Sequence, residues 1–148
     1  MIVQAPASVL VRTCEPVDLE IGRQIAADLR NAMIWSAIHD RRGAAGLAAP
    51  QIGASARVFV LNGHPSAFIN PEVKQVSQKT TIDIEGCLSL PPDVLVSVRR
   101  PKWIKISYIA EHGGLVVRKL HGTDARAALH ELDHLDGILI TDYLKTAA

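Results

Sequence analysis

His130-Glu131-Leu132-Asp133-His134 places two histidines four residues apart on a stretch that reads as a helix. At about 100° per residue, positions i and i+4 lie about 40° apart, so both imidazoles leave the same helical face. Two neutral imidazoles at this spacing can bind one divalent metal ion. Glu131 flanks that face and can reach a water bound to the metal without being a ligand. The pattern therefore predicts a helix that carries a metal site.

A catalytic site of this kind needs a third protein ligand and an open position. The residues after His134 offer no convincing ligand, because Ile140 stands where a third histidine would be expected and Asp136 lies on another face of the helix. Upstream, Cys87 lies in the segment EGCLS at residues 85–89, and a thiolate is a strong ligand for a borderline-soft metal. Cys87 is therefore the better candidate for the third ligand.

Each signal also has an ordinary structural explanation. HExxH occurs by chance, and for that motif alone metal binding and coincidence are about evenly balanced. A lone cysteine such as Cys87 is more often a small buried apolar residue than a ligand. A third segment, GAAGLAAPQ at residues 43–51, is either a Gly-rich turn that lets backbone approach a ligand or an ordinary loop between a helix and a strand. Because the three segments occur together, they favour a functional site more strongly than any one of them does alone.

Together, GLAAPQ at residues 46–51, EGCLS at residues 85–89 and HELDH at residues 130–134 resemble the motifs of the peptide deformylases. The resemblance covers nearly the whole chain, and the three motifs jointly are highly specific. It implies a metal-dependent hydrolase of the family's α+β fold. The implied reaction removes the N-formyl group from the N-terminal formylmethionine of newly made polypeptides.

The same resemblance implies roles for individual residues. It implies three metal ligands, which are Cys87, His130 and His134. Glu131 would be the general acid and base. The side-chain amide of Gln51 and the backbone N–H of Leu88 would surround the scissile carbonyl, and Gly46 would hydrogen-bond the substrate backbone. The donor set suits Zn(II) by ligand type and geometry, whereas the family suggests Fe(II), with nickel or cobalt as active replacements.

Three departures from the family pattern stand out. Ala44 replaces the first glycine of the usual Gly-x-Gly-Leu-Ala-Ala, and its methyl group could narrow the substrate groove. Leu129 replaces the glutamine that usually precedes the first ligand histidine, which removes a polar contact. The chain stops at Ala148, so we expect a short form that lacks the family's C-terminal helix.

Composition agrees with a cytoplasmic enzyme that forms a single domain over residues 1–148. Apolar residues make up 48% of the chain, and the net charge is +1 without a basic tract that would suggest nucleic acid or an anionic membrane. No apolar run approaches the roughly 18 residues of a membrane span, and no secretory signal opens the chain. Cys14 and Cys87 make no disulfide framework. The expected partners are formylmethionyl nascent chains, with ribosome proximity possible without a docking helix.

Periodicity predicts the elements around these motifs. A helix should begin at Asp18, bury a stripe of Ile21, Ile25, Leu29 and Met33, and end near residues 41–43. Strands are expected at 58–61, at 67–70 with Pro71 as its end, at 82–84, and at 103–108, with a hairpin turn at 111–114. Thr123 should cap the metal-binding helix, and Arg99-Arg100 reads as a solvated pair. Antiparallel strands around one central helix make an α+β domain with an N-terminal helix.

Two other functions compete with the deformylase interpretation. One is a zinc peptidase of the HExxH type, which would need a third ligand downstream of His134. The other is a non-catalytic binding module of the same fold, which would be expected to have lost Glu131 or a ligand. The sequence keeps all four residues and offers no convincing downstream ligand.

Overall fold

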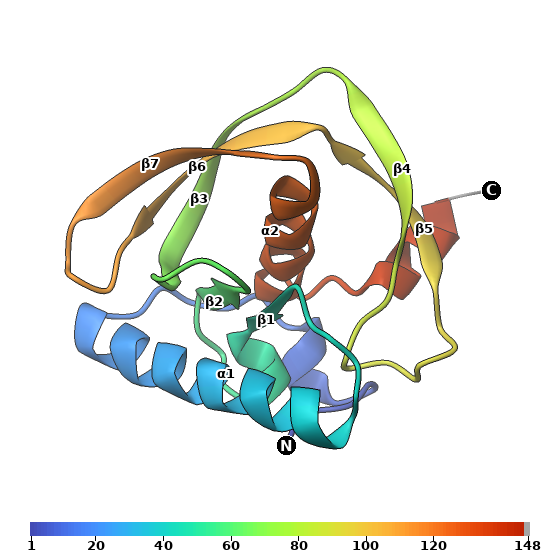
Figure 1. Ribbon diagram of the computed structural model, residues 1–148, viewed down its shortest axis with the longest axis horizontal. Coiled ribbons are helices and arrows are strands. Elements are labelled where there is room, and N and C mark those ends of the chain that lie inside the picture. The colour runs from blue at the N-terminus through green and yellow to red at the C-terminus, as the bar shows by residue number, and fades with distance from the viewer. Residues whose placement is uncertain (147–148) are drawn as a thin grey trace.

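In the computed structural model, which describes residues 1–146, antiparallel strands arch over one central helix (Figure 1). That helix is α2 (Gly122–Leu135), and it carries the HELDH segment. A longer helix, α1 (Leu19–His39), lies across the opposite side of the molecule (Figure 1). The predicted α+β class, with an N-terminal helix and strands around the HExxH helix, is confirmed. Among the described residues, no helix is both long enough and apolar enough to cross a bilayer.

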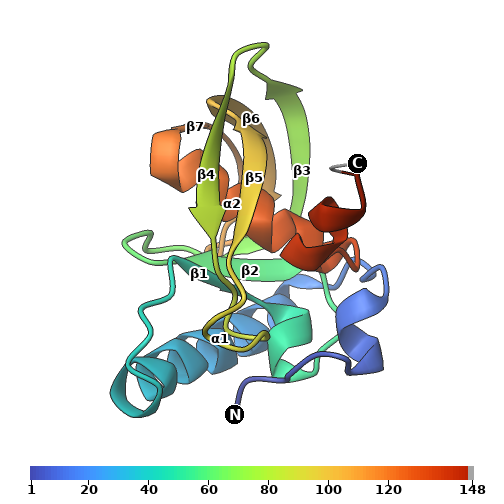
Figure 2. The same ribbon diagram turned by 90° about the vertical axis from the view of Figure 1, so that its right-hand side faces the viewer.

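The strands form two antiparallel sheets within the described residues. The larger sheet has the order β1 (Gly46–Ala48), β2 (Val58–Leu61), β3 (Phe68–Val76), β6 (Trp103–Ile109) and β7 (Leu115–His121). The smaller sheet consists of β4 (Thr80–Glu85) and β5 (Val96–Pro101), which stand beside α2 in Figure 2. The remaining elements are the short 3-10 helices η1 (Ser8–Val11), η2 (Ala49–Ile52) and η3 (Ile140–Thr146).

The inner face of the larger sheet packs on α2. Ile104, Ile106 and Tyr108 alternate along β6, as predicted, and all three are buried in the cluster that also holds Leu132 of α2. The ring of Phe68 stacks on Phe59 with centroids 4.6 Å apart and meets Tyr108 at 4.3 Å. Aromatic contacts at these separations favour a fixed arrangement of rings. The helix that carries the histidines therefore packs against a core whose aromatic rings have a fixed arrangement.

The buried stripe predicted for α1 is wrong in part. Ile21 is 45% exposed, whereas Gly22, Ala26 and Leu29 are buried against the larger sheet. A Cβ atom at Gly22 would lie 2.9 Å from the side chain of Ile69 in β3. The helix approaches the sheet so closely that small residues, which carry little hydropathy signal, define its buried face.

The start of α1 matches the prediction and its end does not. Asp18 caps the helix, because its Oδ1 accepts a hydrogen bond from Ile21 N over 2.9 Å. The helix ends at His39 rather than near residues 41–43, and Asp40 follows as the C-cap. Arg41 has a φ of 58° and so takes the left-handed conformation that a glycine would usually supply.

β3 extends beyond the predicted end at Pro71 and continues to Val76. Asn70 has a φ of 49°, and the pairing with β6 shifts register between Ile69 and Glu72. A bulge at this point leaves one residue outside the ladder, so the missing N–H of Pro71 costs no ladder bond. The longer β3 reaches the top of the arch, from which β4 descends (Figure 1), and Cys87 follows the end of β4 in the sequence.

Candidate metal centre

Helix α2 presents both histidines from one face. It begins at Gly122, which has a φ of 57°, and the predicted Thr123 cap is wrong because His121 is the N-cap and makes no side-chain capping bond. The rings of His130 and His134 lie with centroids 5.1 Å apart. The i, i+4 spacing thus places the two imidazoles side by side, as predicted.

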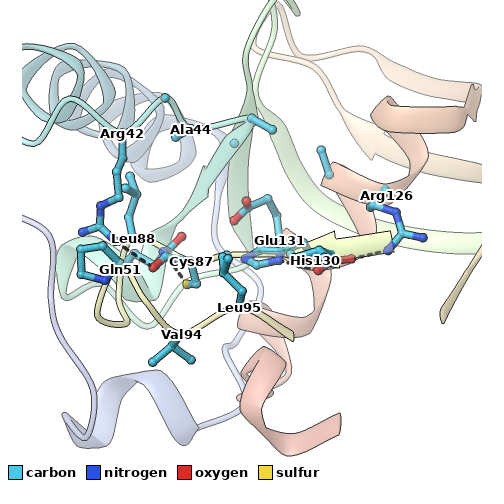
Figure 3. A pocket seen from close by; sticks show the side chains of 18 of the residues that line it. Arg42, Ala44, Gln51, Cys87, Leu88, Val94, Leu95, Arg126, His130 and Glu131 are labelled. Carbon is cyan, nitrogen blue, oxygen red and sulfur yellow. Dashed lines mark hydrogen bonds and ion pairs between the residues drawn. The ribbon is translucent and has the colours of Figure 1, made fainter. Parts of the chain in front are cut away.

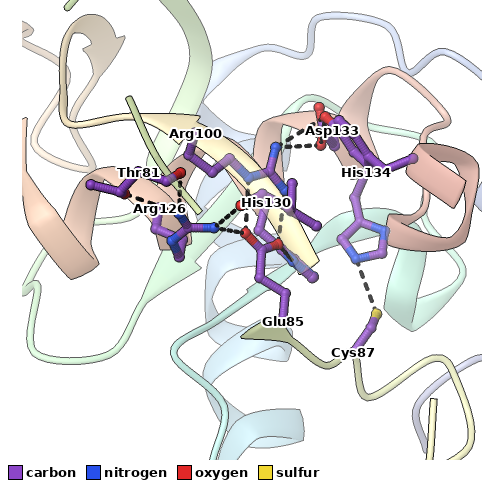
Figure 4. A network of polar contacts seen from close by, with 10 residues as sticks. Thr81, Glu85, Cys87, Arg100, Arg126, His130, Asp133 and His134 are labelled. Carbon is purple, nitrogen blue, oxygen red and sulfur yellow. Dashed lines mark hydrogen bonds and ion pairs between the residues drawn. The ribbon is translucent and has the colours of Figure 1, made fainter. Parts of the chain in front are cut away.

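Cys87 reaches the same point from the loop that follows β4. Its Sγ lies 3.4 Å from Nε2 of His134, and Figure 4 shows the two side chains directed at each other. Potential ligand atoms of Cys87, His130 and His134 all lie within 4.8 Å of one another. Two imidazole nitrogens and one thiol sulfur form a donor set that fits a divalent transition metal. The structure therefore brings together the three residues predicted to be ligands.

Glu85 fixes the orientation of His130. Nδ1 of His130 lies 2.9 Å from Oε1 of Glu85, which leaves Nε2 facing the centre. Arg100 donates to both carboxylate oxygens of Glu85 over 2.8 and 2.9 Å, and Arg126 donates to Oε2 over 2.7 Å (Figure 4). Burial alone would raise the pKa of Glu85, but these partners outweigh it and lower that pKa to about 2. A carboxylate beside the distal nitrogen orients a ligand histidine and raises its basicity.

The two histidines differ in electrostatic environment. Burial opposes a charge on His130, but neighbouring Cys87 and Glu85 outweigh it and raise the pKa of His130 to about 10. Burial and the nearby charge of His130 lower the pKa of His134 to about 3, which keeps that ring neutral. Nδ1 of His134 is buried without a hydrogen-bond partner among residues 1–146. A cation at the centre would compete with the proton on His130 and favour neutral imidazoles.

Glu131 has the properties of a general acid and base. Its side chain is 3% exposed, and its Oε2 has no hydrogen-bond partner within the described part of the chain. Burial raises the pKa of Glu131 to about 7. A carboxyl group that titrates near neutral pH can both accept and return a proton during a reaction.

Cys87, His130 and Glu131 line a cavity of about 460 Å³ (Figure 3). The segment 42–46 forms one wall, and the opposite walls come from the β4–β5 loop and from α2. Gly46 sits where no side chain fits, because a Cβ atom there would lie 2.8 Å from Val60 O and 3.0 Å from Cγ of Glu131. Ala44, one of the departures from the family pattern, also lines this cavity.

Gln51 and Leu88 also line this cavity. Oε1 of Gln51 accepts a hydrogen bond from Ala48 N over 3.0 Å, which fixes the amide. Its Nε2 donates to Oγ of Ser89 over 3.2 Å and lies 3.6 Å from Sγ of Cys87. Leu88 follows Cys87 directly, so its backbone N–H belongs to the loop that carries the thiol.

The buried cation behind the site, Arg100, was not predicted from the sequence. Arg99 is exposed as predicted, but Arg100 is 3% exposed, so the solvated pair is wrong for that residue. Nη1 of Arg100 donates to Asp133 over 2.7 Å, and Oη of Tyr143 donates to the same carboxylate over 2.7 Å. The alternation of Val96, Val98 and Arg100 along β5, all buried, was the signal that could have placed Arg100 inside.

The other residues considered in the sequence lie outside the centre. Leu129 packs against the core cluster beneath α2. Cys14 is 2% exposed and sits in that cluster, as expected for a packed apolar residue. The potential metal-binding group found among residues 1–146 does not include four further histidines, which are His39, His64, His112 and His121.

Comparison with known proteins gives one consistent family. The sequence model described as polypeptide deformylase matches residues 1–148. A peptide deformylase from Thermotoga neapolitana is 48% identical over 105 residues, which are 69% of this chain. The match spans 63% of the length of that relative.

Solved structures give the same likeness over more of the chain. A crystal structure of peptide deformylase from Thermotoga maritima aligns with a TM-score of 0.81 at 38% identity and covers 96% of this chain and 95% of that one. A probable peptide deformylase from synechococcus phage S-SSM7 aligns with a TM-score of 0.84 at 34% identity, covering 97% and 98% of the two chains.

Proposed function

This chain belongs to the polypeptide deformylase family, and we propose that it is a metal-dependent hydrolase that removes the N-formyl group from the formylmethionine of newly made polypeptides. One observation carries the proposal: a cysteine and two histidines converge within 4.8 Å beside a buried glutamate at the end of a cavity. We take residues 1–148 to be one catalytic domain.

Three residues would hold the metal, which are Cys87, His130 and His134. When bound, the metal would supply a Lewis acid that lowers the pKa of a water and polarises a carbonyl. Fe(II) is the proposed metal in the cell, with Zn(II), Ni(II) or Co(II) as alternatives that the same donors accept. A thiolate beside Fe(II) is open to oxidation, so an iron form would lose activity in air.

Glu131 would move the proton. A pKa of about 7 lets its carboxylate take a proton from the attacking water and then deliver it to the leaving amine. Because Glu131 is buried against Gly46 and faces the cavity, the proton would pass within the site rather than through bulk solvent.

Gln51, Leu88 and Gly46 would bind the substrate around its reacting carbonyl. The fixed amide of Gln51 and the N–H of Leu88 are the proposed donors to the oxygen as charge develops there. Gly46 is in the edge strand β1, whose backbone can pair with an extended peptide. Such a substrate would be the formylated end of a nascent chain, which would bring the enzyme close to ribosomes in the cytoplasm.

The test is formate release by metal-loaded protein that is prepared without oxygen, with metal content measured on the same sample. Peptides beginning with formylmethionine should release formate, whereas N-acetyl equivalents should react poorly, because the added methyl group must fit where the family accommodates hydrogen. Replacing the methionine by glycine should cost about 10–100-fold in kcat/KM, since burying an apolar side chain of that size contributes roughly 1.5–3 kcal/mol. Equal rates on formyl and acetyl peptides would contradict the proposed reaction, and internal cleavage without formate would instead indicate the HExxH peptidase.

A further inference from the structure

The turn that carries Cys87 is held from two sides. Leu90 N donates to Cys87 O over 3.1 Å, which closes the turn. The side-chain Nε2 of Gln4 donates to Leu88 O and the backbone N–H of Ala5 donates to Ser89 O, over 2.9 Å each. The carbonyl groups at the two ends of the turn, those of Cys87 and Leu90, also meet a side chain that lines the cavity.

That side chain is Arg42, from the loop between α1 and β1. Its Nη1 donates to Leu90 O over 3.0 Å and lies 3.5 Å from Cys87 O. Its Nε and Nη2 donate a bidentate pair of hydrogen bonds to Oδ1 and Oδ2 of Asp40, over 3.0 and 2.6 Å. Figure 3 shows Arg42 extending from this loop toward Leu88. A planar guanidinium held by a carboxylate is a rigid donor, because two parallel bonds fix its orientation.

Asp40 connects this contact to the fold. It is the C-cap of α1, and its backbone N–H donates to Ser36 O over 2.9 Å. The end of α1, the carboxylate of Asp40, the guanidinium of Arg42 and the turn at residues 87–90 therefore form one continuous chain of contacts. Without Arg42, the two outer carbonyl groups of the turn would lose this restraint on the cavity side.

We propose that Arg42 is a positioning residue that, anchored by Asp40, fixes the turn presenting the Cys87 thiol and the Leu88 N–H. The inference rests on the proposed function, since the turn bears on catalysis only if Cys87 is a ligand. Arg42 acts through the turn, not through contact with the reacting atoms. Partners of this kind typically change metal affinity or activity by about 10–100-fold when removed.

The adjacent Arg41 offers a matched control, because it is exposed and carries the same charge. Arg42→Gln should lower Co(II) affinity and kcat by about 10-fold or more and should alter the thiolate-to-cobalt charge-transfer band. Arg41→Gln should leave all three at wild-type values. In metal-free protein, a thiol reagent should modify Cys87 faster in Arg42→Gln than in Arg41→Gln.

Asp40→Asn gives a second route to the same question if Arg42→Gln does not fold. It keeps the donors of Arg42 but weakens their anchor, so a smaller loss of Co(II) affinity and a partial change in the band are expected. Wild-type affinity and band in folded Arg42→Gln or Asp40→Asn, or an equal loss in Arg41→Gln, would overturn the inference. A wild type that binds Co(II) through Cys87 but releases no formate would contradict the proposed function alone.

Discussion

Glu131 is buried, and its Oε2 has no hydrogen-bond partner within residues 1–146. Glu131→Gln should keep the fold and bound metal, because the glutamate is not a proposed ligand. It should lose at least about 10²-fold in kcat, the usual share of general acid–base catalysis. Metal content and formate release measured on one sample decide the point, with Glu15→Gln at an exposed position as control. If Glu131→Gln came out metal-free, the proposed role of Glu131 as acid and base rather than ligand would be wrong.

Gly46 allows the backbone of β1 to pass close to the side chain of Glu131. A methyl group there would lie 2.8 Å from Val60 O and 3.0 Å from Cγ of Glu131, so either β1 or Glu131 must move. Gly46→Ala should therefore lower kcat/KM by about 10–100-fold, since displacements of about 1 Å cost this much. Gly43→Ala is the control, because Gly43 lines the same cavity and a Cβ there meets nothing within 4 Å. Similar activity in both variants would contradict the close packing.

At the residue scale, the candidate ligands could be predicted from short motifs. The residues that hold these ligands in place could not, because they pair across long distances in the sequence. His130 and His134 share a local spacing, and Cys87 has a distinctive context. The alternation along β5 could have placed Arg100 inside, but it could not identify the partners Glu85 and Asp133, which lie 15 and 33 positions away in the sequence. A buried charge needs an opposite charge beside it, and here only the folded structure locates that charge.

Among the elements, α1 is held to the β6–β7 turn by Glu111. Its carboxylate accepts hydrogen bonds from Arg30 and from Ala67 N, and the bond from Arg30 is the main reason that the pKa of Glu111 is lowered. A lowered pKa means that this stabilisation is present above the unfolded value near 4.5 and is lost as pH falls through the folded value.

Glu111→Gln should therefore destabilise the fold by about 1 kcal/mol at neutral pH. The difference from wild type should shrink as pH falls below about 4.5 and vanish once the wild-type carboxyl is protonated. Urea unfolding at about pH 7 and about pH 3 measures both values, with Glu15→Gln as an exposed control. A difference that is independent of pH would show that the charge of Glu111 does not matter.

The elements that were mispredicted share a physical cause. Periodicity locates strands and helices through large apolar residues, which sufficed for β2 and β6. The buried face of α1 is made by Gly22 and Ala26, whose small size matters more than their hydropathy. β3 passes Pro71 because Asn70 adopts a positive φ at the bulge, where its side chain bonds to the backbone of Val17, 53 positions away in the sequence.

In the whole molecule, the candidate metal centre would join the loop after β4 to α2, two parts that also meet through the polar contacts of Glu85 and Arg100. Cys87 comes from the loop after β4, whereas both histidines come from α2, which packs under the larger sheet (Figure 1). A metal bound by all three side chains would hold these parts together in the folded state. The unfolded chain has no such preformed site, so binding energy becomes folding energy.

Removing the metal should therefore lower Tm. At a free metal concentration about 100 times Kd, binding adds about 2.7 kcal/mol, which for a domain of this size corresponds to a rise of roughly 5–10 °C. The rise should disappear in Cys87→Ala. Cys14→Ala is the matched control: it should lower Tm of the metal-free protein, because Cys14 is in the core, and still keep the full rise on adding metal. A rise that survives in Cys87→Ala, with one equivalent of metal bound, would place the third ligand elsewhere and return the zinc peptidase to consideration.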